Sequence, residues 1–378
     1  MARQNAGNPK FYIDYLSYWK AKGNIEGYGS SNGTSVSSQL NRLIGLNPSD
    51  YLNADLDYDT ENVIRIDLKD GIYMPRGATD KFFIGALGHN FFNIINKDFN
   101  LYLKGHESQG NETVFDTNDI TMDTICNFPT DGSAFEYNGW SLGEWTGGDS
   151  DSFYHIYFTI GSDSANITNQ TILGNLVFGS VFQMPHSPDL KLTMTREYDG
   201  IEQQTTRGGS TLTQINYHNA PDWAGAPAWE LYTGNTINYI NNDFIETRDS
   251  ARGRRVWDLK FSYIDYKDMM PINELVNIFN PTDSNTNSGA GYDTNATGTS
   301  EDFNPSGNFS TDIRRDSSFM GVVMEKTIGG SLPFIFQPDG NNNSPDQFAI
   351  CMIEKDSFSF EQVANGVYDI SLKIREVW

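Results

Sequence analysis

The chain has 378 residues, 49 of them acidic and 26 basic, and its formal net charge at pH 7 is −23. Such a surface repels phosphate, which argues against sequence-specific nucleic-acid binding. No apolar run approaches the ~20 residues that a membrane-spanning helix needs, and the N-terminal residues lack the apolar segment of a signal peptide.

Most apolar segments alternate apolar and polar residues, a pattern typical of a strand with one solvent-facing side. In chain order the pattern occurs at residues 64–68, 99–103, 154–160, 190–194, 257–263 and 368–375. Helical patterns are sparse, and only residues 271–279, with Pro271 in the first turn, predict a short helix. The sequence therefore predicts an all-β fold with one short helix.

Breaks in this pattern divide the chain into three parts. Residues 1–50 are rich in aromatics and then in Gly and Ser, which predicts an irregular N-terminal arm. Residues 51–182 carry one set of predicted strands, and residues 183–378 carry a second set. A break bracketed by two prolines, Pro185 and Pro188, separates the two sets.

The second set is interrupted by a long polar insertion, residues 281–318, from Pro281 to Ser318. Its residues are mostly Asn, Ser, Thr, Gly and Asp, and such a composition cannot bury a core of its own. We therefore expect this insertion to contact other subunits of an assembly. Two short basic segments, residues 207–209 and 252–255, are predicted to be turns or intersubunit salt-bridge partners.

Two Gly-x-Ser-x-Gly segments, centred on Ser31 and Ser141, resemble the nucleophile elbow of hydrolases. That motif needs a strand before the serine and a helix after it, and neither segment has this context. Glu136 and Glu144 are a candidate glycosidase pair, but their separation cannot be read from the sequence. We predict no hydrolytic activity that needs any of these four residues.

Residues 135–145 form a segment rich in tryptophan and tyrosine. Its rings, Tyr137, Trp140 and Trp145, have flat apolar faces that can bind a sugar or another protein. Packing of these aromatics in a protein interface is the interpretation that we favour, and glycan binding is the alternative.

Three aspartates, Asp55, Asp57 and Asp59, resemble the start of a calcium-binding loop. Thr60 stands where an EF-hand has glycine, and Ile66 stands where it has glutamate, which excludes an EF-hand. A solvated acidic loop is favoured, and an irregular calcium site remains open. The histidines and two cysteines lack the spacing of a zinc site, so we predict no metal and no cofactor.

Several segments resemble tail proteins of marine and other environmental bacteriophages. The run FFIGALGHN at residues 82–90 is similar to a strand and turn of the discoidin-like jelly-roll modules in those proteins, and a strand at 99–104 follows it. Residues 173–179 resemble the closing strand of that module, and residues 184–188 resemble the linker after it. The C-terminal residues 329–378 resemble the β-barrel-plus-helix unit of tail-tube and distal-tail proteins.

This resemblance implies a jelly-roll β-sandwich at residues 51–182 and a β-barrel-like module at residues 183–378. It implies a structural protein of the virion, assembled in the host cytoplasm, that forms a ring or adaptor with copies of itself and with other tail proteins. The alternative that it leaves open is a receptor-binding module that holds a host-surface glycan. Neither alternative is an enzyme.

Overall fold

The computed structural model describes the part of the chain to which every structural statement below refers. This part comprises residues 7–30, 37–47, 52–54, 62–73, 81–89, 91, 100–106, 113–117, 121–128, 139–147, 152–161, 171–189, 193–197, 201–215, 253–269, 318–344, 347–364 and 366–377. Within it strands dominate, and all of the strand pairs are antiparallel. The predicted mainly β fold is therefore confirmed.

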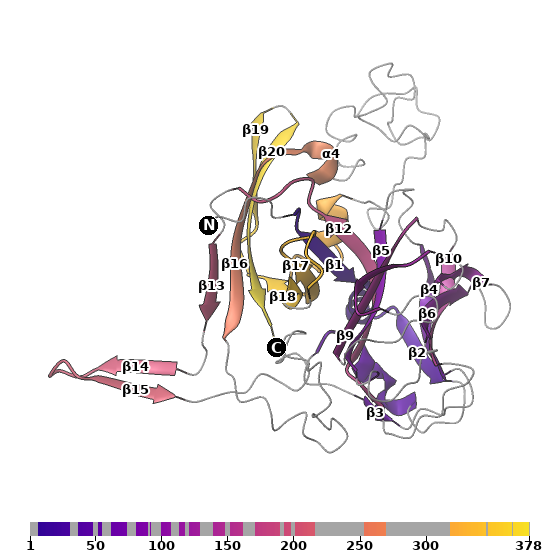
Figure 1. Ribbon diagram of the computed structural model, residues 1–378. Coiled ribbons are helices and arrows are strands. Elements are labelled where there is room, and N and C mark those ends of the chain that lie inside the picture. The colour runs from indigo at the N-terminus through magenta and orange to yellow at the C-terminus, as the bar shows by residue number, and fades with distance from the viewer. Residues whose placement is uncertain are drawn as a thin grey trace.

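One large sheet runs through most of the molecule (Figure 1). Its strands, in spatial order, are β13 (Thr193–Glu197), β16 (Arg254–Asp265), β20 (Val367–Glu376), β18 (Ala349–Ile353), β17 (Phe334–Gln337), β1 (Lys10–Asp14), β12 (Asn175–Gln183), β5 (Lys81–His89), β9 (Gly139–Thr146) and β8 (Asp123–Cys126). The strand β19 (Ser359–Ala364) pairs with β20 beside this path.

Three smaller sheets complete the β structure. A five-stranded sheet has the order β2 (Ile25–Ser30), β4 (Asn62–Tyr73), β10 (Ser152–Gly161), β6 (Asn100–His106) and β7 (Thr113–Asp116). Two pairs stand apart, β3 (Leu52–Ala54) with β11 (Thr171–Leu173), and β14 (Ile201–Thr205) with β15 (Thr211–Ile215). The helices are α1 (Tyr15–Lys22), the 3-10 helix Ser37–Leu43, α4 (Tyr266–Met269) and a π-helix, Met320–Met324.

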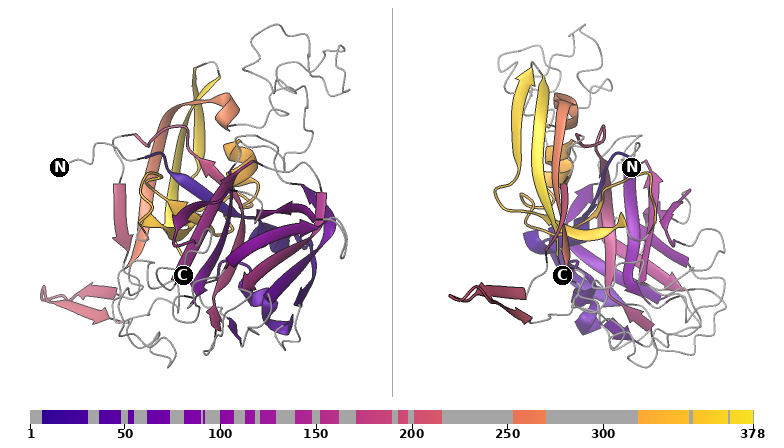
Figure 2. Two further views of the ribbon diagram at one scale, coloured as in Figure 1. Left: turned by 45° about the vertical axis from the view of Figure 1, so that its right-hand side comes forward. Right: turned by 60° about the vertical axis from the view of Figure 1, so that its left-hand side comes forward.

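The five-stranded sheet packs across the β12–β5–β9 end of the large sheet and makes a β-sandwich (Figures 1 and 2). Alternate residues of β4 and β10, including Ile66 and Phe158, face inward and meet Phe82 and Ile84 of β5. The other face of β5 is also buried, because Phe83 lies in a second cluster. Burial on both faces explains why the run at residues 82–87 is apolar throughout instead of alternating.

The C-terminal strands lie in a second core, which they share with Phe11 and Ile13 of β1 and Phe182 of β12. Alternate residues of β20, Ile370, Leu372 and Ile374, are buried, as the alternation predicted, and they pack with Trp257 of β16 and with the π-helix. The predicted helix at residues 271–279 lies outside the described residues. The predicted module boundary near residue 183 stays a prediction, although one sheet contains strands from both sides of it.

The expectation of an irregular N-terminal arm is wrong for the residues described. Strand β1 lies inside the large sheet, between β12 and β17, and its five residues are all buried. The close approach of β1 to β12 needs Gly179, since a Cβ there would lie 1.8 Å from the carbonyl oxygen of Ile13. Helix α1 follows at once, and it was missed because its buried residues form no clear apolar stripe.

Asp14 joins β1 to α1 from a fully buried position. Its carboxylate caps the helix by accepting hydrogen bonds from the backbone N–H groups of Leu16 (3.2 Å) and Ser17 (3.0 Å), and it also accepts one from Phe178 N–H (3.3 Å). Burial nevertheless outweighs these bonds and raises the pKa of Asp14 to about 6.

A first prediction concerns this carboxyl group. Between pH 3.8 and 6 the folded chain holds a proton on Asp14 that the unfolded chain has released, so Asp14 lowers the free energy of unfolding as pH rises. A shift of this size corresponds to about 3 kcal/mol. Asp14→Asn keeps a capping oxygen but cannot ionise. Urea unfolding from pH 4 to 7 should show wild type losing about 2.5 kcal/mol relative to this variant, and a constant difference would contradict the pKa.

Candidate functional site

The hairpin of β14 and β15 projects from the body of the molecule (Figures 1 and 2). Five residue pairs, from Ile201↔Ile215 to Thr205↔Thr211, join its strands, and Gly209 at its turn has a φ of +82°. Every residue from 201 to 214 is exposed except the half-buried Thr206. An isolated two-stranded hairpin is marginally stable in water, so packing against a second surface would stabilise this one.

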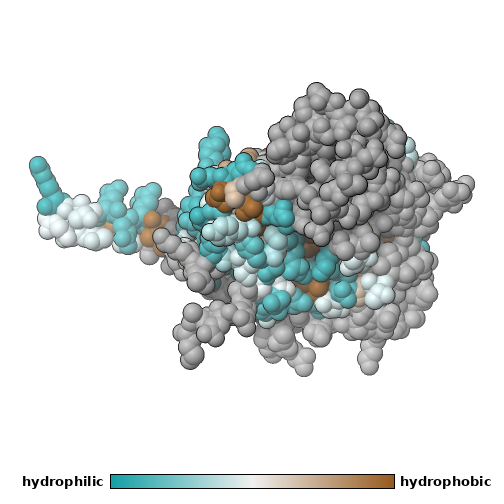
Figure 3. Space-filling view, turned by 90° about the horizontal axis from the view of Figure 1, so that it is seen from above, coloured by the Kyte–Doolittle hydropathy of each residue, from teal (hydrophilic) through white to brown (hydrophobic). Residues whose placement is uncertain are grey.

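Few charges lie on this hairpin, although the chain as a whole is strongly acidic. Residues 201–215 contain only Glu202 and Arg207, which cancel, so the rest of the chain carries the whole net charge of −23. Leu212 is 61% exposed and Ile201 is 39% exposed. The surface view shows a projecting arm of mainly hydrophilic and intermediate residues with a few hydrophobic ones (Figure 3).

Strand β13 is the terminal strand of the large sheet at the end nearest the hairpin. It pairs with β16 from Thr193↔Asp258 to Glu197↔Arg254, and its other edge pairs with no described strand. Its first four residues are exposed, and Met194 is 53% exposed. An open edge of this kind presents unpaired backbone N–H and C=O groups and is a template for another strand.

The sequence did not single out this arm as a functional element, although it carried a usable signal. Two runs of Thr, Gln and apolar residues flank a Gly-Gly turn at residues 208–209, which is typical of a hairpin. Of the alternatives predicted for residues 207–209, the structure supports a turn.

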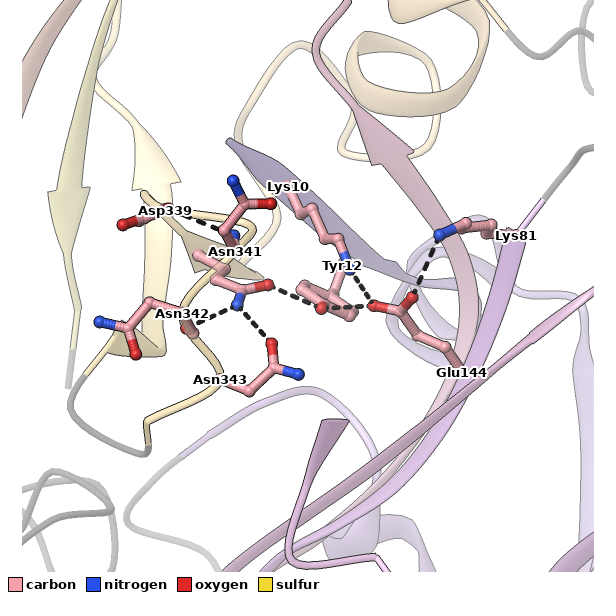
Figure 4. Close-up of polar contacts among 9 residues, drawn as sticks. Lys10, Tyr12, Lys81, Glu144, Asp339, Asn341, Asn342 and Asn343 are labelled. Atoms are coloured by element: carbon pink, nitrogen blue, oxygen red, sulfur yellow. Dashed lines mark hydrogen bonds and ion pairs between the residues drawn. The ribbon is translucent and has the colours of Figure 1, made fainter. Parts of the chain in front are cut away.

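A buried polar network links β1 to β9 and to β17 of the large sheet (Figure 4). Glu144 of β9, 2% exposed, accepts hydrogen bonds at Oε1 from Lys10 Nζ (2.8 Å) and from Tyr12 OH (2.6 Å). Lys81 Nζ lies 3.7 Å from the other carboxylate oxygen. The carboxylate is therefore surrounded by donors, as a buried charge requires.

On the C-terminal side, the network continues through Gln337 of β17. Its Oε1 lies 2.9 Å from Tyr12 OH, and its Nε2 donates to Asn342 O (2.9 Å) and Asn343 Oδ1 (3.1 Å). Burial and the neighbouring Glu144 raise the pKa of Tyr12 well above 10, so the phenol keeps its proton. The Tyr12 hydroxyl has one proton for two possible acceptors, and it donates that proton in the shorter hydrogen bond to the carboxylate of Glu144.

This network positions the strands that it joins, and it lacks the access that catalysis needs. Lys10, Tyr12, Glu144 and Gln337 are each at most 6% exposed. The predicted glycosidase partner, Glu136, lies outside the described residues. Glu144 is thus placed as the partner of a buried lysine.

Ser141, the centre of one Gly-x-Ser-x-Gly segment, is paired with a histidine. His89 Nε2 lies 2.7 Å from Ser141 Oγ, and both residues are almost fully buried. Because His89 Nδ1 accepts a bond from the backbone N–H of Phe91 (3.3 Å), the proton is on Nε2, which donates to the serine. A general base must accept from its nucleophile, so this pair is arranged the wrong way for catalysis.

Two of the three predicted contact aromatics are core residues. Trp140 is 3% exposed and Trp145 is 1% exposed, and the two rings belong to different clusters. They are five positions apart on β9, an odd spacing that places them on opposite faces of the strand. The prediction that these two rings contact a glycan or another protein is therefore wrong, and Tyr137 lies outside the described residues.

The other predicted site residues fall mostly outside the described part of the chain. Pro281 and the aspartates Asp55, Asp57 and Asp59 are outside it. Ser318, the last residue of the predicted assembly segment, is 2% exposed, and its Oγ accepts a bond from Gly321 N–H (3.2 Å). The expectation that Ser318 contacts a neighbour is therefore wrong, since its side chain is buried just before the π-helix Met320–Met324.

Within the described ranges, no three His, Cys, Asp or Glu side chains are grouped so that they could hold a metal ion. Both cysteines, Cys126 and Cys351, are buried there as free thiols. No helix of the described part is long and apolar enough to span a membrane.

No family model and no curated protein matches this chain. Solved structures similar to it include CBM32-3 from a family 31 glycoside hydrolase of Clostridium perfringens, at 14% identity and a TM-score of 0.26, with 42% of this chain and 92% of that chain covered. The C-terminal domain of a chitobiase from Bacteroides fragilis is similar at 11% identity and a TM-score of 0.26, with 41% and 91% covered.

A third similar structure contains the CBM32-1 and CBM32-2 domains of Clostridium perfringens ZmpB in complex with GalNAc. Its identity to this chain is 13% and its TM-score is 0.27, with 47% of this chain and 40% of that chain covered. Scores this low carry no argument about function, and the β-sandwich assignment depends on the sheets and cores described above.

Proposed function

We propose that this chain is a structural subunit of a bacteriophage tail, where it assembles with copies of itself and with other tail proteins into a ring or adaptor. The observation that carries the proposal is the projecting β14–β15 hairpin, an exposed and nearly uncharged arm on a strongly acidic protein. In an isolated monomer such a hairpin would be only marginally stable, because it has no surface to pack against. The resemblance of residues 82–90 and 329–378 to tail proteins supports the location.

The chemistry of the candidate catalytic groups agrees with a structural role. Ser141 accepts a hydrogen bond from His89 instead of donating one, and Glu144 accepts a hydrogen bond from Lys10. Neither group reaches solvent. Glycan binding stays a prediction, and it now depends on residues other than Trp140 and Trp145.

The second prediction tests the arm. Replacing residues 201–215 with a short Gly-Ser linker should reduce the purified protein from an oligomer to a monomer, measured by multi-angle light scattering. The sandwich and C-terminal cores do not include these residues, so near-wild-type thermal unfolding is expected. Ser210→Ala at the exposed turn, which leaves the charge of the hairpin unchanged, is the matched control, and it should leave the oligomer intact.

Location is tested in intact particles. Antibodies against the purified protein should label the tails of phage particles in electron micrographs. Labelling of capsids alone, or a wild-type protein that stays monomeric at high concentration, would contradict the proposal. Binding to a glycan array by a monomer would favour the receptor-binding alternative.

A further inference from the structure

We propose that the β14–β15 hairpin of one copy pairs with the open edge of β13 in a second copy, and so extends the large sheet across the contact. This inference deepens the proposed self-assembly and rests on it. The partner is a second copy of this chain, and the contact is strand addition, in which backbone hydrogen bonds provide most of the recognition.

Donor and acceptor edges both occur in this chain. The hairpin forms a two-stranded sheet of its own, with both outer edges unpaired among the described strands. Strand β13 ends the large sheet with an outer edge that is likewise unpaired among them. Each has strands of five residues, so the two edges match in length.

The connection between β13 and β14 is short. Only residues 198–200 separate the end of β13 from the start of β14. Three-residue connections are common in β-hairpins, so β14 would be expected to fold back on β13 of its own chain. Among the described strands, β14 instead pairs with β15 alone. The edge left open within one chain is identical in every copy, and a second copy can cover it, as in domain swapping.

Charge also favours a contact between these two segments. Two copies of a chain with a net charge of −23 repel each other at most points of approach. The hairpin is an exception, since Glu202 and Arg207 cancel. On β13, Arg196 and Glu197 also cancel, and Glu197 is held by Arg375 Nη2 at 2.9 Å. A contact between these two segments therefore avoids the repulsion that disfavours other contacts between copies.

Side chains on the two edges are also compatible. Strand β13 begins Thr-Met-Thr and strand β15 begins Thr-Leu-Thr. Threonine pairs and pairs of apolar side chains are favourable neighbours across antiparallel strands. Met194 and Leu212, both more than half exposed in the single chain, would each gain a neighbour.

Cross-linking between differently labelled copies tests the inference. Met194→Cys is prepared in one batch of full-length protein, and Leu212→Cys or Gln204→Cys, one on each hairpin strand, in another. The native cysteines are buried and remain as they are. A short bis-maleimide, which tolerates either face of a strand, should join the mixed proteins into a covalent heterodimer.

Val363→Cys supplies the matched control, because Val363 is 45% exposed on β19, away from both edges. Mixed with Met194→Cys, it should give at least tenfold less heterodimer. A chain carrying both Met194→Cys and Leu212→Cys distinguishes copies from one chain, since pairing within the chain gives a cross-linked monomer.

The inference is overturned if the mixed proteins give no more heterodimer than the control, or if only cross-linked monomers form. Its failure is distinguishable from failure of the proposed function. An oligomer that persists after the hairpin is replaced would keep self-assembly and reject this contact, whereas a wild-type monomer would reject both.

Discussion

His89→Gln is expected to remove a large contribution to acid instability from the described part of this protein. Burial lowers the pKa of His89 from 6.5 to about 3. The unfolded chain takes up a proton on this histidine below pH 6.5, whereas the folded chain does not until about pH 3. The unfolded state therefore binds more protons in this window, and the free energy of unfolding falls as pH falls.

The size of the effect follows from the shift. A difference of about 3.5 units corresponds to roughly 5 kcal/mol over the whole window, and about 3 kcal/mol of this is lost by pH 4. Gln at position 89 can still donate to Ser141, but it does not titrate. Urea unfolding at pH 7 and pH 4 should show wild type losing about 3 kcal/mol more than the variant.

A second substitution separates burial from hydrogen bonding as the cause. Ser141→Ala removes the hydroxyl 2.7 Å from His89 Nε2 but leaves the imidazole buried and stacked on Phe91. Since desolvation is the cause of the low pKa, this variant should keep the acid sensitivity of wild type. Equal acid losses in wild type and His89→Gln would reject the assignment. Asp14 acts with the opposite sign over an overlapping pH range, so each variant is compared with wild type separately.

The fold class was predictable because alternation in the sequence reports directly on which face of a strand is buried. Ile370, Leu372 and Ile374 show this, as do Ile66 and Ile156 on the sandwich strands. What alternation cannot report is which strands pair. Strand β1 was missed because its partners, β12 and β17, come from residues 175–183 and 334–337.

The buried polar network around Tyr12 was less predictable for the same reason. Tyr12 meets Glu144 across 132 positions of sequence and Gln337 across 325, and no local pattern encodes such contacts. The aromatic segment was different, since the odd spacing of Trp140 and Trp145 already places their rings on opposite faces of a strand. Composition suggested an exposed cluster there, and the spacing argued against it.

Glu144→Gln is expected to destabilise the protein by about 3–5 kcal/mol, because the substitution leaves a buried lysine without its counter-charge. The side chain of Lys10 is 7% exposed and that of Glu144 is 3% exposed, so water cannot replace the lost partner. Gln preserves the shape of the side chain, and thus the change in charge is isolated. Chemical unfolding at pH 7 measures the loss.

An exposed ion pair provides the control for this substitution. Lys373 Nζ and Glu354 Oε2 are 2.7 Å apart, but the two side chains are 38% and 42% exposed. Exposed pairs contribute about 0–1 kcal/mol, so Glu354→Gln should change stability by less than about 1 kcal/mol. If both substitutions had the same small effect, the buried network would have no special role.

A double variant shows whether the polar network around Glu144 stabilises the fold, or whether it only selects this arrangement of strands over others. Lys10→Met with Glu144→Leu replaces the pair by apolar side chains, a change that is often nearly neutral. Tyr12 can then donate its freed proton to Gln337 Oε1, already 2.9 Å away. We therefore expect the double variant to recover most of the stability lost in Glu144→Gln. In the described sheet, β1 alone connects β12 to β17. If the double variant recovers stability but its sheet is less rigid, amide hydrogen exchange in β1 should be faster than in wild type. Full recovery with unchanged exchange would mean that packing by Phe11 and Ile13 alone holds β1 in place.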